Sequence, residues 1–222
     1  MKKVFIYVEG QTEETFVNQV LAPYFINKDV FLIAILSTTK RAKNGSKFKG
    51  GITSYMKVRN DIITLSYDSS AALITTMLDY YRLPSSFPGK NSLPNGTALQ
   101  KVSFLEEEFR KDINLGIFLP FITLHEFESL LFSSPQQIAS AFPRHRNLEN
   151  QLVAIRNHYD SPEEINDGPN THPAMRIINE VPDYKKPLHG SIIASRIGLN
   201  QIRTECNHFD RWIVQLESYL SI

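Results

Sequence analysis

The sequence predicts an α/β fold: a three-layer domain around a mostly parallel sheet, followed by a helical C-terminal extension. Four apolar, strand-like runs stand at residues 4–8, 30–36, 71–78 and 116–123. Runs that are apolar throughout and separated by helical patterns are typical of parallel βαβ units with both sheet faces covered. No strong strand run follows residue 132. We therefore expect an α/β domain over residues 1–132 and a helical extension over residues 133–222, packed on it as one compact unit.

The first strand leads directly into a helix. The run at residues 4–8 stops before Gly10, which permits a sharp turn. Thr12 is a candidate N-cap, and Glu13 and Glu14 suit the first helical turn. Apolar residues then recur at helical spacing up to the second strand, which we expect to be followed by a basic loop over residues 40–51.

The rest of the chain contains further helical patterns and one predicted loop. Residues 55–66, 97–113, 151–158 and 173–181 have helical patterns, and the proline- and glycine-rich segment 84–96 predicts a loop. The last predicted helix carries one apolar stripe, formed by Phe209, Trp212, Ile213, Leu216 and Leu220. This stripe indicates a helix docked on the α/β core.

Composition narrows the class of protein. The chain has 222 residues, of which 42% are hydrophobic and 21% charged, as in globular proteins. The net charge of +1 gives no overall electrostatic signal for nucleic acid, so a basic surface would have to be local. A lone cysteine, Cys206, excludes an internal disulfide and a cysteine zinc site, and favours the cytoplasm. The apolar run near the N-terminus predicts neither a signal peptide nor a membrane span.

Acidic residues follow three of the predicted strands. Glu9 and Asp79 each end a strand, Glu126 and Glu128 follow the fourth, and Glu13 opens the first helix. The carboxyl ends of parallel strands meet at one sheet edge, where open α/β sheets bind ligands. Clustered carboxylates repel one another unless a cation intervenes, and hard divalent cations prefer oxygen ligands. The pattern therefore predicts a Mg²⁺ or Mn²⁺ site suited to phosphoryl chemistry.

Other motifs add little. The sequence has no Walker loop, no dinucleotide-binding glycine pattern, no HExxH motif and no nucleophile elbow. His125 is the best-placed histidine, with a structural role as the alternative, and Cys206 is expected in the core. Glu163, Glu164 and Asp167 are interpreted as a solvated acidic turn.

The segment after the second strand is the best candidate for binding nucleic acid. Its basic residues are Lys40, Arg41, Lys43, Lys47 and Lys49. Phosphate attraction supplies most non-specific affinity for nucleic acid, and a solvated loop is the alternative interpretation. Later in the chain, Lys185, Lys186 or Arg176 could supply a charge-stabilising cation, and the sequence does not distinguish among them.

Several motifs together resemble a known group. VEGQTEE at 8–14 and LDYY at 78–81 resemble the Toprim domain of topoisomerases, primases and overcoming-lysogenization-defect nucleases. The wider pattern resembles the bacterial domain-of-unknown-function 4276 family, a Toprim-like group; its further motifs are HEFESLLF at 125–132, PEEINDGPNTHP at 162–173 and KPLHG at 186–190. The resemblance implies a Toprim-like fold over nearly the whole chain.

By this resemblance, Glu9 is an acid/base or metal ligand, Asp79 is the first acid of a metal-binding DxD pair, and Glu13 matches an extra acid of the nuclease branch. The second acid of the pair is replaced by Tyr81, and a phenol with a pKa of about 10 is a poor ligand for Mg²⁺ at neutral pH. We expect Glu126, or else Glu128, to supply the missing carboxylate. If neither does, the site is degenerate.

The resulting expectation is a Mg²⁺- or Mn²⁺-dependent nuclease, with Glu9 as the catalytic residue and Glu9, Glu13, Asp79, Glu126 and Glu128 as metal ligands. The expected partners are DNA or RNA and, from the resemblance alone, an ATPase acting in trans in a bacterial defence system. A homodimer stays open. The alternatives are a non-catalytic nucleic-acid-binding regulator and a small-molecule phosphohydrolase.

Overall fold

A five-stranded parallel sheet forms the centre of the fold. The computed structural model describes residues 1–41, 47–49, 52, 54–166 and 170–221. The strands of this sheet are β1 (Lys2–Val8), β2 (Val30–Leu36), β5 (Ala71–Asp79), β6 (Phe118–Leu119) and β7 (Ile122–Thr123). They run in the order β2-β1-β5-β6, and β7 also pairs with β5. The predicted α/β fold with a parallel sheet is confirmed.

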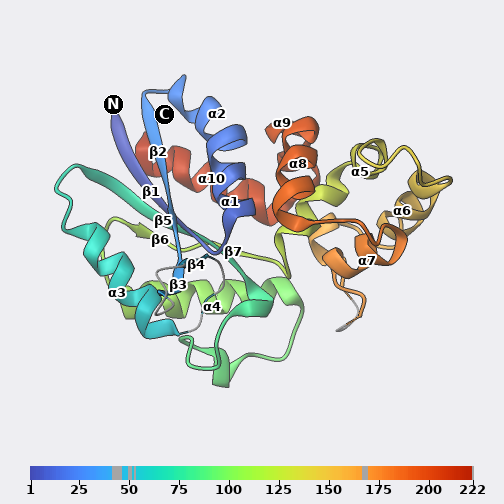
Figure 1. Ribbon diagram of the computed structural model, residues 1–222. Coiled ribbons are helices and arrows are strands. Elements are labelled where there is room, and N and C mark those ends of the chain that lie inside the picture. The colour runs from blue at the N-terminus through green and yellow to red at the C-terminus, as the bar shows by residue number, and fades with distance from the viewer. Residues whose placement is uncertain (42–46, 50–51, 53, 167–169, 222) are drawn as a thin grey trace.

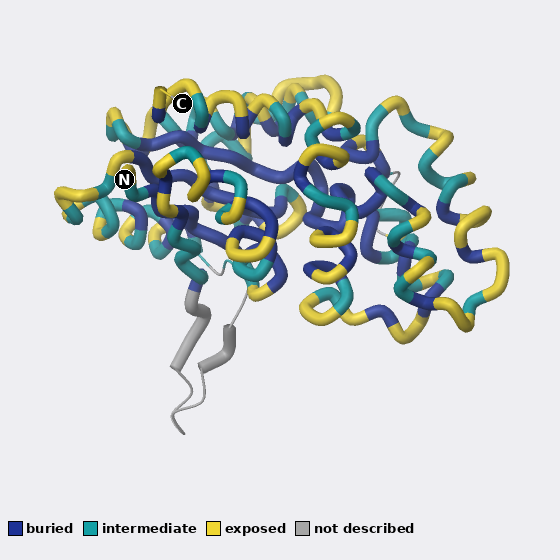
Figure 2. Tube along the Cα trace, turned by 90° about the horizontal axis from the view of Figure 1, so that it is seen from above, coloured by how far each residue is buried: buried dark blue, intermediate teal, exposed yellow. Residues whose placement is uncertain are grey.

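Helices cover both faces of the sheet (Figure 1). On one face lie α1 (Gln11–Phe16), a π-helical turn (Val17–Leu21), α2 (Ala22–Ile26) and α10 (Asn207–Leu220). On the other face lie α3 (Tyr55–Ser66) and α4 (Ala98–Ile113). Side chains of β1 alternate between the two faces, so that Val4 and Ile6 join one core while Phe5 and Tyr7 join the other. Figure 2 shows the buried strands enclosed by helices whose outer turns are exposed.

The start of α1 differs from the prediction. Thr12 is not the N-cap, because the helix already begins at Gln11 and Gly10 occupies the capping position. Thr12 is instead buried, and its methyl group packs closely against Gly190. Glu13 and Glu14 do lie in the first turn, as predicted.

The predicted strand at 116–123 is divided in two. Pro120 separates β6 from β7, and a proline has no N–H group to donate to a strand ladder. The Thr76 hydroxyl replaces the missing pairing, since it donates to Phe121 O at 2.8 Å and accepts from Phe121 N at 3.0 Å. Ile122, the first residue of β7, donates its backbone N–H to the Glu106 carboxylate at 2.8 Å.

The described part of the basic segment contains two short strands. β3 (Thr38–Arg41) and β4 (Lys47–Lys49) pair as antiparallel strands, which corrects the expected loop at these positions. β3 begins two residues after the end of β2, so its backbone starts at the carboxyl edge of the sheet. Lys43 lies outside the described residues.

The second half of the chain is helical in its described part. Its α-helices are α5 (Pro135–Ser140), α6 (Leu148–Arg156), α7 (Pro173–Glu180), α8 (Ser191–Ile197), α9 (Leu199–Glu205) and the final α10. Short 3-10 helices span Tyr80–Arg82, Lys90–Ser92, Phe127–Ser133 and Pro162–Glu164, and a second π-helical turn spans Lys186–Gly190. No described helix is long and apolar enough to cross a membrane.

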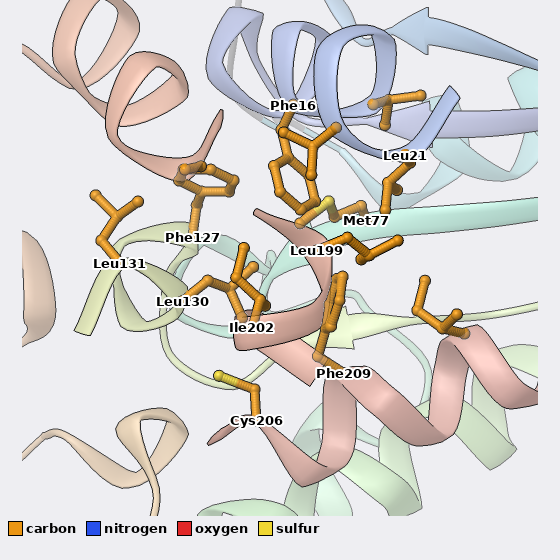
Figure 3. Packing of buried hydrophobic residues seen from close by; sticks show 14 of the residues in the cluster. Phe16, Leu21, Met77, Phe127, Leu130, Leu131, Leu199, Ile202, Cys206 and Phe209 are labelled. Atoms are coloured by element: carbon orange, nitrogen blue, oxygen red, sulfur yellow. The ribbon is translucent and has the colours of Figure 1, made fainter. Parts of the chain in front are cut away.

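The same hydrophobic core contains side chains from both halves (Figure 3). Phe16 and Met77, from α1 and β5, meet Phe127, Leu199 and Phe209. The Phe16 ring contacts the rings of Phe127 and Phe209 edge-on, with centroids 5.4 and 6.0 Å apart. These contacts join the C-terminal helices to the sheet.

Trp212 is the largest side chain with which α10 contacts the sheet. Its ring stacks on Phe121 with centroids 4.3 Å apart, and its Nε1 donates to Thr75 Oγ1 at 2.9 Å. Both rings are almost fully buried.

We expect Trp212→Ala to lower the free energy of unfolding by about 3–5 kcal/mol, because it leaves a large cavity and removes the bond to Thr75. Urea unfolding measures this loss. Val214→Ala, at an exposed position on the same helix, is the control and should change little. Equal effects of the two substitutions would contradict the role of Trp212 in joining α10 to the sheet.

Candidate functional site

Three buried carboxylates surround the ammonium of Lys186. Its Nζ lies 3.0 Å from Asp79 Oδ2, 3.0 Å from Glu128 Oε2 and 3.4 Å from Glu13 Oε1. Glu9 lies beside them, since its Oε2 accepts from Asp79 N at 3.3 Å. All four acids are 4% exposed or less, and we call Glu9, Glu13, Asp79 and Glu128 the carboxylate cluster.

The ends of two neighbouring strands place half of the cluster. β1 and β5 pair in parallel, with Val8 opposite Met77, so Glu9 and Asp79 emerge at the same edge of the sheet. Gly10 then turns the chain into α1. A Cβ atom on Gly10 would lie 2.9 Å from Glu13 Oε2, so glycine here allows the Glu13 carboxylate to approach the backbone.

The fourth acid, Glu128, and the lysine come from segments further along the chain. The 3-10 helix after β7 carries Glu128, and its first backbone amide, Phe127 N, donates to Asp79 Oδ1 at 3.0 Å. Tyr184 OH donates to Glu128 Oε1 at 3.1 Å. Lys186 opens the second π-helical turn, two residues after Tyr184.

Burial and repulsion by neighbouring charges raise the pKa values of Glu9, Glu13 and Glu128. Burial, with the charges of Asp79 and Glu13, raises the pKa of Glu9 to about 8 although Arg82 and Lys186 act in the opposite direction. Burial is also the main cause that raises the pKa of Glu128 to about 7, against the opposing charge of Lys186. The pKa of Glu13 is raised for the same reason.

Lys186 remains charged. Burial lowers the pKa of its ammonium, but the charges of Asp79, Glu128 and Glu13 outweigh burial and raise it well above the ordinary value. Arg82 is the second cation, with its Nε 3.6 Å from Glu9 Oε1 and its side chain 56% exposed. One half-buried cation therefore contacts three of the four buried acids, some of which hold protons near neutral pH.

The donor set fits a hard divalent cation. Two buried atoms, Glu13 Oε1 and Glu128 Oε2, accept no hydrogen bond from the described residues, although both lie near Lys186. Carboxylate oxygens are the ligands that Mg²⁺ and Mn²⁺ prefer. Within the described part of the chain, however, no three His, Cys, Asp or Glu side chains are already arranged around one ion position. A cation would therefore have to take the place of the Lys186 ammonium.

Glu126 contacts a different set of residues from the four acids of the cluster. Its Oε2 is 2.7 Å from His172 Nδ1 and accepts from Ala174 N, in the first turn of α7, at 3.2 Å. The sequence favoured Glu126 as the replacement for the acid missing at Tyr81. It is Glu128, the second choice, that contacts Lys186.

Some residues of the site were not singled out from the sequence. Lys186 was one of three interchangeable cations, while Arg82, His172 and Tyr184 were not proposed. Lys186 lies in the motif KPLHG and Arg82 directly follows the motif LDYY, and these motifs were the available signals. The side chains of Lys40, Arg41, Lys47 and Lys49 are not described, so their role stays a prediction.

Two expectations outside the cluster have clear outcomes. The predicted solvated turn is wrong for Glu163, which is buried, and confirmed for Glu164, which is exposed; Asp167 lies outside the described residues. The Glu163 carboxylate accepts from His208 N at 2.8 Å and Phe209 N at 3.1 Å, and so caps the start of α10. Cys206 is buried in the core beside Ser133, as predicted.

We expect the metal-free protein to lose stability as the pH rises from about 4.5 to about 8, because folding raises the pKa of Glu9 from 4.5 to about 8. The folded state holds a proton there that the unfolded state releases, which is worth up to about 1.4 kcal/mol per pH unit. Urea unfolding across this range should give a shallower slope for Glu9→Gln than for the wild type. The exposed Glu149→Gln is the control, and identical slopes for both variants would contradict the assignment.

We expect Lys186→Met to destabilise the metal-free protein by about 3 kcal/mol near pH 8, because three buried carboxylates lose their counter-ion. The loss should be smaller near pH 5, where the acids take up protons. Urea unfolding at both pH values measures this, with the exposed neighbour Lys185→Met as the control. A loss that is independent of pH would show that Lys186 acts only through packing.

Comparison with known proteins gives a family. The family model described as "Domain of unknown function (DUF4276)" matches residues 8–217, which include the whole carboxylate cluster and Lys186. Neither the comparison with curated proteins nor that with solved structures finds a match. Because the matched region spans most of the chain, this protein belongs to the domain-of-unknown-function 4276 family.

Proposed function

We propose that this protein is a Mg²⁺- or Mn²⁺-dependent nuclease that hydrolyses phosphodiester bonds at the carboxylate cluster. One observation carries the proposal: four buried acids from separate elements meet at the carboxyl edge of a parallel sheet, and three of them pair with the half-buried Lys186. Sites of this kind are costly to fold and are typical of functional centres.

Glu9, Glu13, Asp79 and Glu128 are the residues that would hold the ion. When bound, a divalent ion polarises the phosphoryl group and lowers the pKa of a coordinated water. Glu9 lies at the end of β1 beside Asp79, within the ligand set, so it is also the candidate general base. Arg82 lies beside Glu9 and is more than half exposed, which suits a contact with a substrate phosphate.

The arrangement supports a Toprim-like relationship. Glu9 follows the first strand of the sheet and Asp79 ends the neighbouring parallel strand, which are the positions that the resemblance assigns to the first two Toprim acids. The basic segment that follows β2 begins at the same edge, which suits nucleic acid as the substrate. An ATPase partner acting in trans in a bacterial defence system is proposed from the resemblance alone.

A second candidate is a non-catalytic regulator that binds nucleic acid. Lys186 favours it, because an internal ammonium neutralises the acids without a metal ion. The tyrosine at position 81, where the resemblance expects an acid, favours it as well.

A cleavage assay with single- and double-stranded DNA and RNA tests the proposal. We expect wild-type protein to cleave in Mg²⁺ or Mn²⁺ and to stop in EDTA. Glu9→Gln and Asp79→Asn should each lose about a hundredfold or more in rate, because they remove the base and a ligand. Glu149→Gln is the matched control, an exposed acid whose loss should leave the rate unchanged. Equal cleavage by all four proteins would overturn the assignment.

Mn²⁺ binding, measured by electron paramagnetic resonance, separates the two candidates. Binding that is lost in Asp79→Asn, without cleavage of any nucleic acid by the wild type, would support the regulator. Cleavage that requires the metal would support the nuclease.

A further inference from the structure

An exposed aromatic ring lies next to the carboxylate cluster. Tyr81 is 41% exposed and sits two residues after Asp79, in the 3-10 helix that follows β5. Its ring lies 5.4 Å from that of His125, 6.1 Å from that of Tyr80 and 6.1 Å from that of His172. We call Tyr80, Tyr81, His125 and His172 the aromatic platform.

The aromatic platform adjoins two acids, Asp79 and Glu126. Tyr81 N donates to His125 O at 3.3 Å, directly beyond the pairing of Asp79 with Thr123. His125 has a φ of +63°, a left-handed conformation that is unfavourable for residues other than glycine. Glu126 is the next residue after His125, and its carboxylate contacts the His172 ring. Strained backbone of this kind tends to be retained where a side chain must be aimed.

Positive charge lies at the margins of the aromatic platform. Lys90 Nζ is 4.2 Å from the centroid of the Tyr80 ring, and Arg82 is the next residue after Tyr81.

We propose that Tyr81 stacks against an unpaired base of single-stranded nucleic acid and so directs the adjacent phosphodiester to the carboxylate cluster. Stacking on aromatic side chains between basic residues is how proteins hold single strands without reading their sequence. A duplex keeps its base faces inside the stack and cannot present one to Tyr81. The tyrosine that replaces an expected acid is thereby a substrate contact.

This inference rests on the proposed function for the role of the acids, but its test measures binding alone. The probe is a fluorescein-labelled oligothymidylate with phosphorothioate linkages that resist hydrolysis, and fluorescence anisotropy in Mg²⁺ reports its binding. We expect Tyr81→Leu to weaken this binding about tenfold, and Tyr81→Phe to leave it near the wild-type value. Tyr219→Leu removes an equally exposed tyrosine from α10 and is the matched control.

A duplex probe and a mononucleotide define the substrate class. The affinity for the duplex should be the same in wild type and Tyr81→Leu, and thymidine monophosphate should compete poorly with the oligonucleotide. Competition by the mononucleotide as strong as by the oligonucleotide would overturn the proposal in favour of a small-molecule site.

Tyr81→Trp tests the same contact in case Tyr81→Leu does not fold. The chain has one tryptophan, the buried Trp212, so Tyr81→Trp adds an exposed fluorophore at the platform. Its emission should be quenched by the single strand and not by the duplex. No quenching, or unchanged oligonucleotide binding by Tyr81→Leu, would overturn the stacking role. Loss of cleavage activity alone would not, because neither readout depends on turnover.

Discussion

The ion pairs of Lys186 are the interaction on which the site depends. Carboxylates removed from water repel one another, and each loses hydration that only a close cation or donor can replace. Lys186 supplies that cation to acids from α1, the end of β5 and the segment after β7. Because these segments are distant in the chain, the pairs also join the C-terminal region to the sheet.

This arrangement has a stability cost that a simpler core would avoid. Apolar residues of similar volume often stabilise a protein as well as buried ion pairs do, or better. Retaining four acids together, three of them around one lysine, is therefore expected where the acids have a chemical role, since active sites commonly give up stability for function. The raised pKa values of Glu9 and Glu128 are the measurable sign of this cost.

Much of the sheet edge could be predicted from the sequence. Apolar runs ending in Glu9 and Asp79 indicated parallel strands, and parallel pairing brings such ends together. Lys186 could not be singled out, because its contact with Asp79 joins residues 107 positions apart and depends on how the last helices pack. Glu128 was ranked below Glu126 for a similar reason, since a 3-10 helix rather than a continuing strand sets which acid faces Lys186.

The local errors also have physical causes. Thr12 has the chemistry of a cap, but close packing against Gly190 buries it inside the first turn. Pro120 divided a strand that its apolar neighbours predicted to be continuous, because no pattern of hydrophobicity reports a missing N–H. Glu163 was predicted to be exposed to solvent because its segment is polar, whereas the first backbone amides of α10 donate to its carboxylate.

The Pro120 break changes how the sheet can meet other chains. An open edge strand offers free N–H and C=O groups to any passing β-strand, which is a common route to sheet extension and aggregation. Here Pro120 has no N–H to offer, and Glu106 occupies the amide of Ile122. A second copy of the chain therefore finds no continuous ladder at these residues.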